Sequence, residues 1–318
     1  MSNSTDAESA ASYRFHPDDL NPGARLPGIG AFMRVKNGAD FLEATIRSHL
    51  PCVDEIVVVH NQCTDATPAI LARLAAEFGD KLRVFHYLPK VFPPGGEGHA
   101  REPADSPASF VNQSNFALTR TRYRVAVKLD DDHLAMAGRL ASLTGRIRQA
   151  GYKLPEVLCF SGINLAGDEA GRTGVRAREP FAGAGDHFFF EVTPATRFIH
   201  HPRFEDFHHG RRRVFADFTY WHLKYLKPGF GFANRDIDAG NERFQRKRAA
   251  FLADRRVITL ADVRRMAPAW IDVAAMLPLP EKARLKVDRW RKFLGDPPGE
   301  DEMRQALAFS RRSVQPVS

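Results

Sequence analysis

Three consecutive carboxylates and a histidine follow an apolar run near the middle of the chain. The sequence AVKLDDDH ends in Asp130, Asp131, Asp132 and His133, directly after a stretch typical of a buried strand. In open α/β sheets, ligands bind beside the carboxyl ends of the strands. Carboxylate oxygens there suit Mg²⁺ or Mn²⁺ better than zinc. The stretch therefore predicts a metal-dependent site, against the simpler alternative of a solvated turn, which aspartates also favour.

The flanking segments alternate between strand and helix patterns, which is typical of a parallel sheet in an α/β protein. The predicted strands cover residues 28–35, 56–59, 82–88, 125–129 and 157–163, and the predicted helices cover 39–50, 68–78, 109–121 and 137–150. Residues 92–108 are rich in Pro and Gly, and long irregular insertions of this kind are usually lids or binding loops. We therefore expect this segment to lie beside the site.

Composition is that of an ordinary globular protein with a basic C-terminal part. The 318 residues include 43% hydrophobic residues and carry a net charge of +8. Residues 241–318 contain 17 Lys and Arg against 10 Asp and Glu, so most of this charge lies there. The three cysteines indicate no disulfide framework, and we see no apolar run of the ~18 residues that a membrane-spanning helix needs. The chain is expected to be cytoplasmic.

Three motifs in order resemble glycosyltransferase family 2, whose nucleotide-sugar domain has the GT-A fold. They are Asn37 with the block FLEATIRS, then DEIVVVHNQCTDAT, then LDDDH, and the resemblance covers about residues 28–135. It implies a Rossmann-like, mostly parallel sheet flanked by helices. It also implies an inverting transfer of a sugar from a nucleoside diphosphate sugar to an acceptor hydroxyl, assisted by Mg²⁺ or Mn²⁺, with UDP as the first expectation for the nucleotide.

The resemblance assigns roles to several residues. Asp65 corresponds to the acidic contact to the nucleoside, and Asp130 and Asp132 are the outer members of the DxD motif, with Asp132 the expected direct metal ligand. The family usually has Asp at the position of His60, which is a departure. The further residues expected at the nucleotide or its metal are Arg34, Lys36, Asn37, Asp131, His222 and Lys224. For His222, a core histidine satisfied by hydrogen bonds is the alternative.

An inverting transferase also needs a general base that removes the acceptor proton. Asp186, in GAGDHFFFEV, is the first choice, because two glycines give it room and a run of phenylalanines supplies a dry wall. The alternatives are Glu191, Glu205 and Asp206. An ordinary surface carboxylate is the competing interpretation for each of them.

The C-terminal part contains an amphipathic helix pattern at 281–294, with Trp290 and aliphatic residues on one stripe and six basic residues around it. Such a helix can lie in an anionic membrane interface, or it can pack on its own domain. Residues 295–318 are expected to be frayed.

The chain is thus interpreted as a leader (1–25), a GT-A catalytic domain (26–235) and a basic helical C-terminal region (236–318). Within the catalytic domain, 28–135 is the donor part and 136–235 the acceptor part. The expected partners are a nucleotide-sugar donor, a saccharide or lipid-linked saccharide acceptor of cell-surface glycan synthesis, and an anionic membrane surface.

Two alternative functions remain. A sugar-phosphate nucleotidyltransferase is one, although PGIGAFMRVKN is a poor version of the glycine-rich loop with which such enzymes begin. A nucleic-acid binder is disfavoured because three carboxylates repel a phosphate backbone. The sequence leaves the sugar, the linkage and the oligomeric state open.

Overall fold

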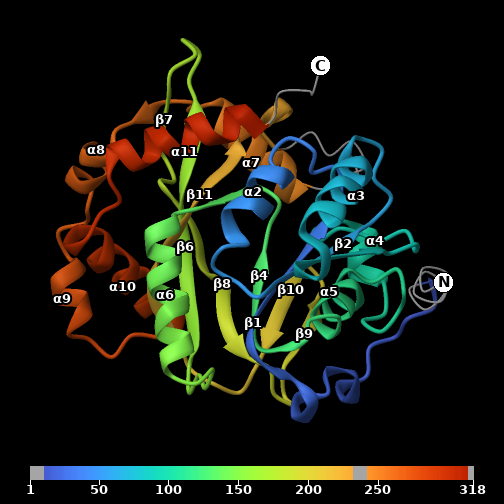
Figure 1. Ribbon diagram of the computed structural model, residues 1–318. Coiled ribbons are helices and arrows are strands. Elements are labelled where there is room, and N and C mark those ends of the chain that lie inside the picture. Colours follow the sequence, from blue (N-terminus) through green and yellow to red (C-terminus); the bar gives the residue numbers. More distant parts are fainter. Residues whose placement is uncertain (1–10, 232–241, 314–318) are drawn as a thin grey trace.

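The computed structural model describes residues 11–231 and 242–313. The predicted boundary between catalytic domain and C-terminal region, at residues 235 and 236, lies outside this part, as do residues 1–10 of the predicted leader. A ten-stranded sheet forms the centre of the molecule (Figure 1). Its parallel core has the order β3–β2–β1–β4 and consists of β1 (Leu26–Val35), β2 (Glu55–His60), β3 (Leu82–His86) and β4 (Tyr123–Leu129).

Beyond β4 the sheet becomes mostly antiparallel. Strand β8 pairs with both β4 and β6, and β11 runs parallel to β6 and antiparallel to the short β5. The strands of this half are β5 (His133–Ala135), β6 (Val157–Gly167), β7 (Thr173–Arg176), β8 (Phe181–Glu191), β11 (Arg213–Tyr225) and β12 (Val257–Ile258).

Helices cover both faces of the parallel core, which explains why β2 is apolar along almost its whole length. Alternate side chains of β1 serve the two faces: Met33 packs in the cluster of α2, α3 and α6, whereas Phe32 packs in that of α5. The helices are α2 (Leu42–His49), α3 (Thr67–Phe78), α5 (Phe110–Thr119) and α6 (Ala137–Gln149). A hairpin of β9 (Arg197–His201) and β10 (Phe204–His208) lies beside α5.

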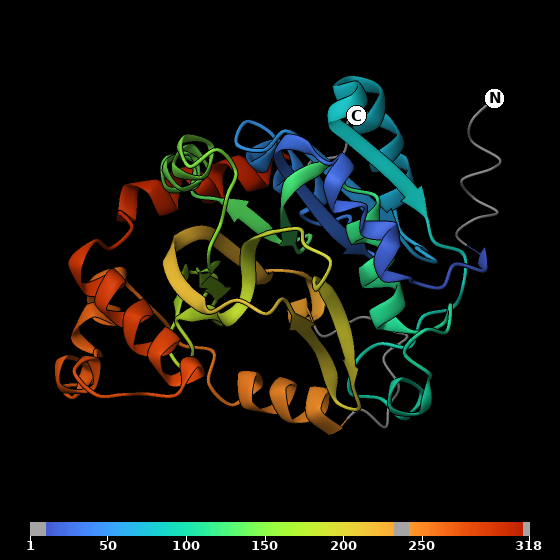
Figure 2. The same ribbon diagram turned by 90° about the horizontal axis from the view of Figure 1, so that it is seen from below.

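The C-terminal helices α8 to α10 gather at the side of the molecule opposite α3 (Figures 1 and 2). Their bounds are α8 (Leu260–Arg265), α9 (Ile271–Ala275) and α10 (Glu281–Gly295), preceded by α7 (Glu242–Leu252) and followed by α11 (Glu300–Ser313). Phe293 of α10 and Met303 of α11 are buried against Phe218 and Trp221 of β11. These helices therefore belong to the same core as the second half of the sheet.

The α/β class, a sheet with a parallel core flanked by helices and a helical C-terminal end are confirmed. Every strand and helix predicted between residues 28 and 163 is present. In the segment 92–108 a short helix, α4 (Glu97–Arg101), has formed. No helix within the described ranges is long and apolar enough to cross a membrane.

Of the two alternatives for the apolar stripe of 281–294, packing on the protein's own domain is observed: Val287 is buried and Trp290 half-buried, and α10 lies against β8, β11 and α9. Two expectations need correction. Residues 300–313 are helical rather than frayed, since α11 buries Met303. The leader is more ordered than expected from residue 11 onward: two 3₁₀ helices, Pro17–Leu20 and Pro22–Ala24, form there, and Leu20 is buried in the core.

Candidate metal centre

The three aspartates lie where β4 ends and the chain turns into β5, so backbone pairing decides what surrounds them. Strand β5 pairs with β11, and the register sets His222 opposite His133. The backbone N–H of Leu223 also donates to the carbonyl of Asp132 (2.9 Å). The turn of the aspartates is thereby fastened to the strand that carries the late histidine.

Asp132 and His222 face each other at the centre of the site. The amide nitrogen of Asn164 donates to the carbonyl of Glu179 (2.8 Å), so its oxygen points to Nδ1 of His222, 2.6 Å away. Nδ1 must then carry the hydrogen, which leaves the lone pair of a neutral His222 on Nε2. Nε2 lies 3.4 Å from Oδ1 of Asp132. Two lone pairs facing each other call for a shared cation or proton, and metal-bound histidines typically donate their other ring N–H to an oxygen acceptor, as His222 does to Asn164.

Lys227, which the sequence did not single out, supplies the counter-charge for two of the aspartates. Its Nζ lies 2.9 Å from Oδ2 of Asp131 and 2.9 Å from Oδ2 of Asp132. Burial raises the pKa of the Asp132 carboxyl, but Lys227 and His222 outweigh burial and hold it well below its usual range. The two oxygens of Asp132 therefore serve different cations, with Oδ2 toward the ammonium and Oδ1 toward His222.

The loops after β1 and β2 close over this turn. Gly38 comes so near that a Cβ there would lie 2.5 Å from Oδ2 of Asp131. Asn37, at a positive φ of 54°, accepts a hydrogen bond from the backbone of Thr64 (2.8 Å). Asp65 accepts from the backbone of Ala39 (3.0 Å) and of the first residue of α3 (3.0 Å). The predicted Asn37 and Asp65 thus lie in the two loops at this edge of the sheet, where both brace the backbone.

Of two basic side chains that were expected to bind the phosphates of the nucleotide, Arg34 and Lys36, the first already forms an ion pair within the protein. Arg34 pairs with Glu205 (2.8 Å) and stacks on Phe110, with 3.8 Å between its guanidinium carbon and the ring centroid. Lys128 also pairs with Glu205 (2.7 Å). Burial raises the pKa of Glu205, but these two cations lower it overall, so Glu205 is held ionised. Lys36 is half-buried in the loop after β1.

Lys224 is half-buried and lies close enough to Asp132 for their charges to interact. Burial nonetheless lowers the pKa of Lys224 overall, and the charge of Asp132 opposes that effect.

The four candidate bases lie in different places. Asp186 is exposed on β8, next to His187 in the chain, and its charge acts on the buried Tyr220 together with those of Asp130 and Asp132. Glu191 lies opposite Val125, at the start of β4, and pairs with Arg211 (2.7 Å), so it is at the other end of the strand from the aspartates.

Asp206, the last of the four, is exposed on β10 and lies 3.7 Å from the guanidinium of Arg213. Among the four acids, Asp186 is the one whose charge acts on the same buried tyrosine as those of Asp130 and Asp132.

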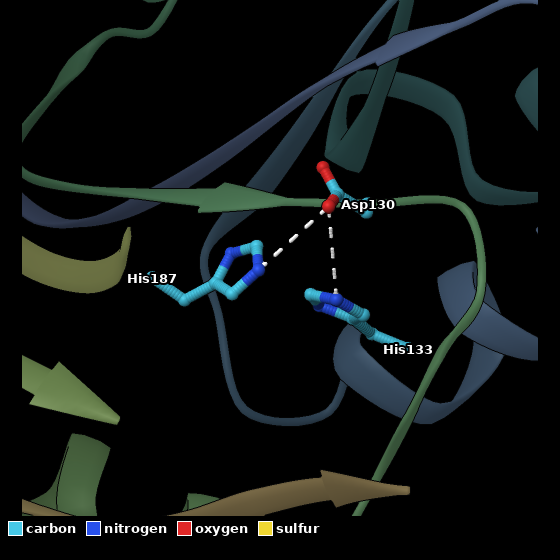
Figure 3. Close-up of side chains that lie close together, drawn as sticks. All are labelled: Asp130, His133 and His187. Carbon is cyan, nitrogen blue, oxygen red and sulfur yellow. Dashed lines mark ion pairs between the residues drawn. The ribbon is translucent and has the colours of Figure 1, made fainter. Parts of the chain in front are cut away.

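A second group of side chains lies under Asp130. His133 is fully buried and stacks on Tyr220, with 3.7 Å between ring centroids. His133 and His187 both direct Nε2 at the carboxylate of Asp130 (Figure 3), at 3.9 and 3.7 Å. Burial lowers the pKa of His133 well below its usual range, so its imidazole is neutral.

Sequence reasoning did not find Lys227, Asn164 or His187. A usable signal existed for His187, because HFFF follows two glycines in a strand pattern, but its partner Asp130 is 57 positions away. Asn164 and Lys227 carry no motif, and only the pairing of β11 with β6 brings them to the site.

No family model matches this sequence, and no curated protein matches it either. Among solved structures, one similar chain is TarS of S. aureus, residues 1–349, with 11% identity, 90% of this chain and 88% of that chain covered, and a TM-score of 0.36.

Glucosyl-3-phosphoglycerate synthase of Mycobacterium tuberculosis, in complex with Mn²⁺, UDP and phosphoglyceric acid, matches with 16% identity over 47% of each chain and a TM-score of 0.28. A mycobacterial protein matches with 12% identity, 74% of this chain and 79% of that chain covered, and a TM-score of 0.36. Identity and superposition are both low, so the functional assignment depends on the residues described above.

Proposed function

We propose that this protein is a metal-dependent glycosyltransferase that uses a nucleoside diphosphate sugar, with UDP as the first candidate nucleotide. The observation that carries the proposal is the opposition of Asp132 Oδ1 and His222 Nε2, with Asn164 setting the tautomer. Their separation of 3.4 Å fits two ligands of one divalent ion. A bound Mg²⁺ or Mn²⁺ would neutralise the charge of the leaving diphosphate.

The surrounding residues fit the remaining needs of such a site. Lys227 balances part of the negative charge of Asp131 and Asp132. This reduces the electrostatic repulsion between these carboxylates and the diphosphate of the donor. Asn37 and Asp65 lie in the adjoining loops, where the resemblance expects the nucleoside. Lys36 and Lys224 are the nearby cations that we assign to the phosphates.

Asp186 is our choice for the base of an inverting reaction. Its carboxylate would take the proton of the acceptor hydroxyl while the hydroxyl oxygen attacks the anomeric carbon. The bond between that carbon and the diphosphate oxygen breaks, and its electron pair leaves with the nucleoside diphosphate. Glu205 is less suited, because Arg34 and Lys128 stabilise its ionised form and occupy its oxygens.

For the acceptor we propose a glycan or lipid-linked saccharide of cell-surface polysaccharide synthesis, reached from the cytoplasmic side of an anionic membrane. Exposed apolar side chains on and beside α9 support this, since Trp270, Val273 and Met276 are 56%, 58% and 78% exposed. The exposed Lys282 and Lys286 of α10 follow them in the chain. An aromatic and aliphatic surface near lysines suits an anionic lipid interface.

Flotation with vesicles of anionic and of neutral lipids tests the membrane part. Wild-type protein should float with anionic vesicles at low salt, and the double variant Trp270→Ser, Met276→Ser should remain at the bottom. Equal flotation of the two proteins would show that Trp270 and Met276 do not bind the membrane.

Thermal unfolding with UDP, GDP, CDP and dTDP, each with and without Mn²⁺, tests the catalytic proposal. Binding to the folded state raises stability by mass action, about 2.7 kcal/mol at a hundredfold excess over Kd. We expect one nucleotide to raise the Tm only when Mn²⁺ is present. Asp132→Ala should lose that shift while remaining folded, and Asp168→Ala, which removes the partner of the exposed Arg172, should keep it.

Product analysis separates this function from sugar-phosphate nucleotidyl transfer. A glycosyltransferase releases the nucleoside diphosphate from the nucleotide sugar. A nucleotidyltransferase instead releases pyrophosphate from a nucleoside triphosphate and a sugar phosphate. Pyrophosphate as the product, with no release of diphosphate from any nucleotide sugar, would replace our proposal with the alternative.

A further inference from the structure

The strongest feature not used by the proposed function is the group of Asp130, His133 and His187 beneath the aspartate turn (Figure 3). One ligand atom from each residue lies within 4.8 Å of the others, and His133 also forms a second such group with Asp132 and His222. Both Nε2 atoms approach the same oxygen, Oδ2 of Asp130, at 3.9 Å from His133 and 3.7 Å from His187.

These distances are too long for hydrogen bonds, whose usual N···O range ends near 3.2 Å. They are close to what a shared ion requires, because two ligands bonded at about 2.0 to 2.1 Å in tetrahedral geometry are roughly 3.3 Å apart. Shortening the two N···O separations by roughly 0.4 to 0.6 Å would bring the carboxylate and each imidazole to the spacing of two ligands on one ion. The 43% exposure of the Asp130 side chain gives an ion a route from solvent.

The buried nitrogens show that something is missing from this group. His133 is 0% exposed, and neither of its ring nitrogens has a hydrogen-bond partner among the described residues; the same holds for Nδ1 of His187. A buried polar atom left without a partner costs about 1 to 3 kcal/mol. An ion bound at Nε2 of His133 would supply the partner of that nitrogen, whereas Nδ1 of each ring would still lack one.

The rings are held in place without that ion. Tyr220 stacks on His133 at 22° between ring planes, and His187 packs edge-on against it at 82°, with 4.6 Å between centroids. Strand pairing fixes the backbones, since His133 is in register with His222 and Val127 with Phe189, two residues beyond His187. The two histidines are therefore held on strands, His133 at the start of β5 and His187 within β8, and Asp130 directly follows β4.

We propose that Asp130, His133 and His187 bind a second divalent ion of the Zn²⁺ and Co²⁺ class, separate from the ion between Asp132 and His222. Two imidazoles and one carboxylate favour such borderline ions, whereas Mg²⁺ prefers oxygen ligands throughout. The ion joins the end of β4 to β8 and β5 beneath the site. This inference does not depend on the proposed glycosyl transfer.

Cobalt titration of the full-length, metal-stripped protein tests the inference without any nucleotide. Visible absorption reports Co²⁺ bound to imidazole, and metal analysis after gel filtration counts the ions. We expect two ions in the wild type, one in His222→Ala and one in His187→Ala. A large excess of Mg²⁺ should leave the absorption of His222→Ala unchanged.

One further variant and a matched control complete the design. Asp130→Asn keeps the shape of the side chain but removes the charge, so it should weaken the second ion at least about 100-fold, the upper end of what loss of an outer-shell partner costs. His86→Ala, which removes a ring stacked on His60 away from this group, should bind as the wild type does. Circular dichroism checks that each variant is folded.

Either of two results would overturn the inference. One is that His187→Ala and Asp130→Asn bind both ions with wild-type affinity. The other is a single ion in the wild type that both His187→Ala and His222→Ala abolish, since that would make the five residues one site. Cobalt binding by His222→Ala in a protein that binds no nucleotide would uphold the second ion while refuting the proposed function.

Discussion

At the scale of single residues, three neighbouring aspartates of one turn have three different sets of partners. Asp130 faces His133 and His187, Asp131 faces Lys227, and Asp132 is shared between Lys227 and His222. The motif LDDDH predicted a cation site, but it did not predict that each aspartate would have different partners. Several of these partners come from β8, β11 and the segment after β11, which no local sequence pattern connects to the motif.

Replacing Lys227 by Met should destabilise the protein by roughly 3 kcal/mol, because it leaves the buried carboxylate of Asp132 and the half-buried carboxylate of Asp131 without their cation. The same carboxylates should then attract Mn²⁺ more strongly, so Mn²⁺ should raise the Tm of the variant more than that of the wild type. Thermal unfolding with and without Mn²⁺ measures both effects.

The matched control is Arg172→Met, which breaks an ion pair whose arginine is 77% exposed. Such a pair contributes at most about 1 kcal/mol. An equal response of both variants to Mn²⁺ would mean that Lys227 does not balance the charge of the cation site.

Gly38→Ala should be destabilising by about 1 to 3 kcal/mol, because its Cβ would meet Asp131 and Val35 at 2.5 and 2.7 Å. It should also weaken Mn²⁺-dependent nucleotide binding by displacing the turn. Gly145→Ala in α6, where nothing lies within 4 Å of the added carbon, should instead stabilise by about 0.5 to 1 kcal/mol. Chemical denaturation of both variants checks the contrast, and similar values for the two would contradict it.

At the scale of elements, α2 carries a buried histidine that senses pH. His49 is 3% exposed, and Nδ1 donates to the carbonyl of Thr45 (2.9 Å). Burial lowers the pKa of His49 to about 4. The unfolded chain takes up this proton near pH 6.5, so the contribution of neutral His49 is complete above pH 6.5 and is lost as pH falls toward 4.

The wild type should therefore lose about 2 kcal/mol more of its free energy of unfolding between pH 7 and 4.5 than His49→Gln does. Urea titrations at a series of pH values measure the difference. His208→Gln, at an exposed position on β10, is the control and should follow the wild type. Parallel pH profiles for wild type and His49→Gln would rule out the role.

The elements also show where sequence reasoning succeeds. Strands β1 to β4 and helices α2, α3 and α5 were predictable because each is a local pattern, a short apolar run for the buried strands and a repeat of period 3.6 for the helices. The hairpin β9–β10 and α11 were not, since their order comes from contacts distant in sequence. The amphipathic pattern of α10 was recognised, but periodicity alone does not show whether its apolar stripe contacts a membrane or packs against the rest of the protein.

At the scale of the whole molecule, the C-terminal helices share a core with the second half of the sheet. Phe293 is fully buried and packs on Phe181 and Phe218, with ring centroids 5.0 and 5.8 Å away. We therefore expect one cooperative thermal transition for the entire chain. Scanning calorimetry should show a single peak that Phe293→Ala shifts as a whole, by an amount reflecting about 3 to 5 kcal/mol.

Met276→Ala, at a position 78% exposed, is the control and should leave that peak in place. Two separate peaks, of which Phe293→Ala moves only one, would show that the C-terminal helices unfold independently of the sheet.

The double pairing of β11 has a kinetic consequence. Hydrogen bonds to β6 and β5 hold this strand on both sides, so His222 stays beside Asp132 whether or not an ion is present. Loading of the site then requires no rearrangement of the chain, and the slow step becomes the loss of water from the incoming ion. Mg²⁺ gives up its water reluctantly. We expect Mn²⁺ to enter and leave faster than Mg²⁺ by a margin set by the ions rather than by the protein.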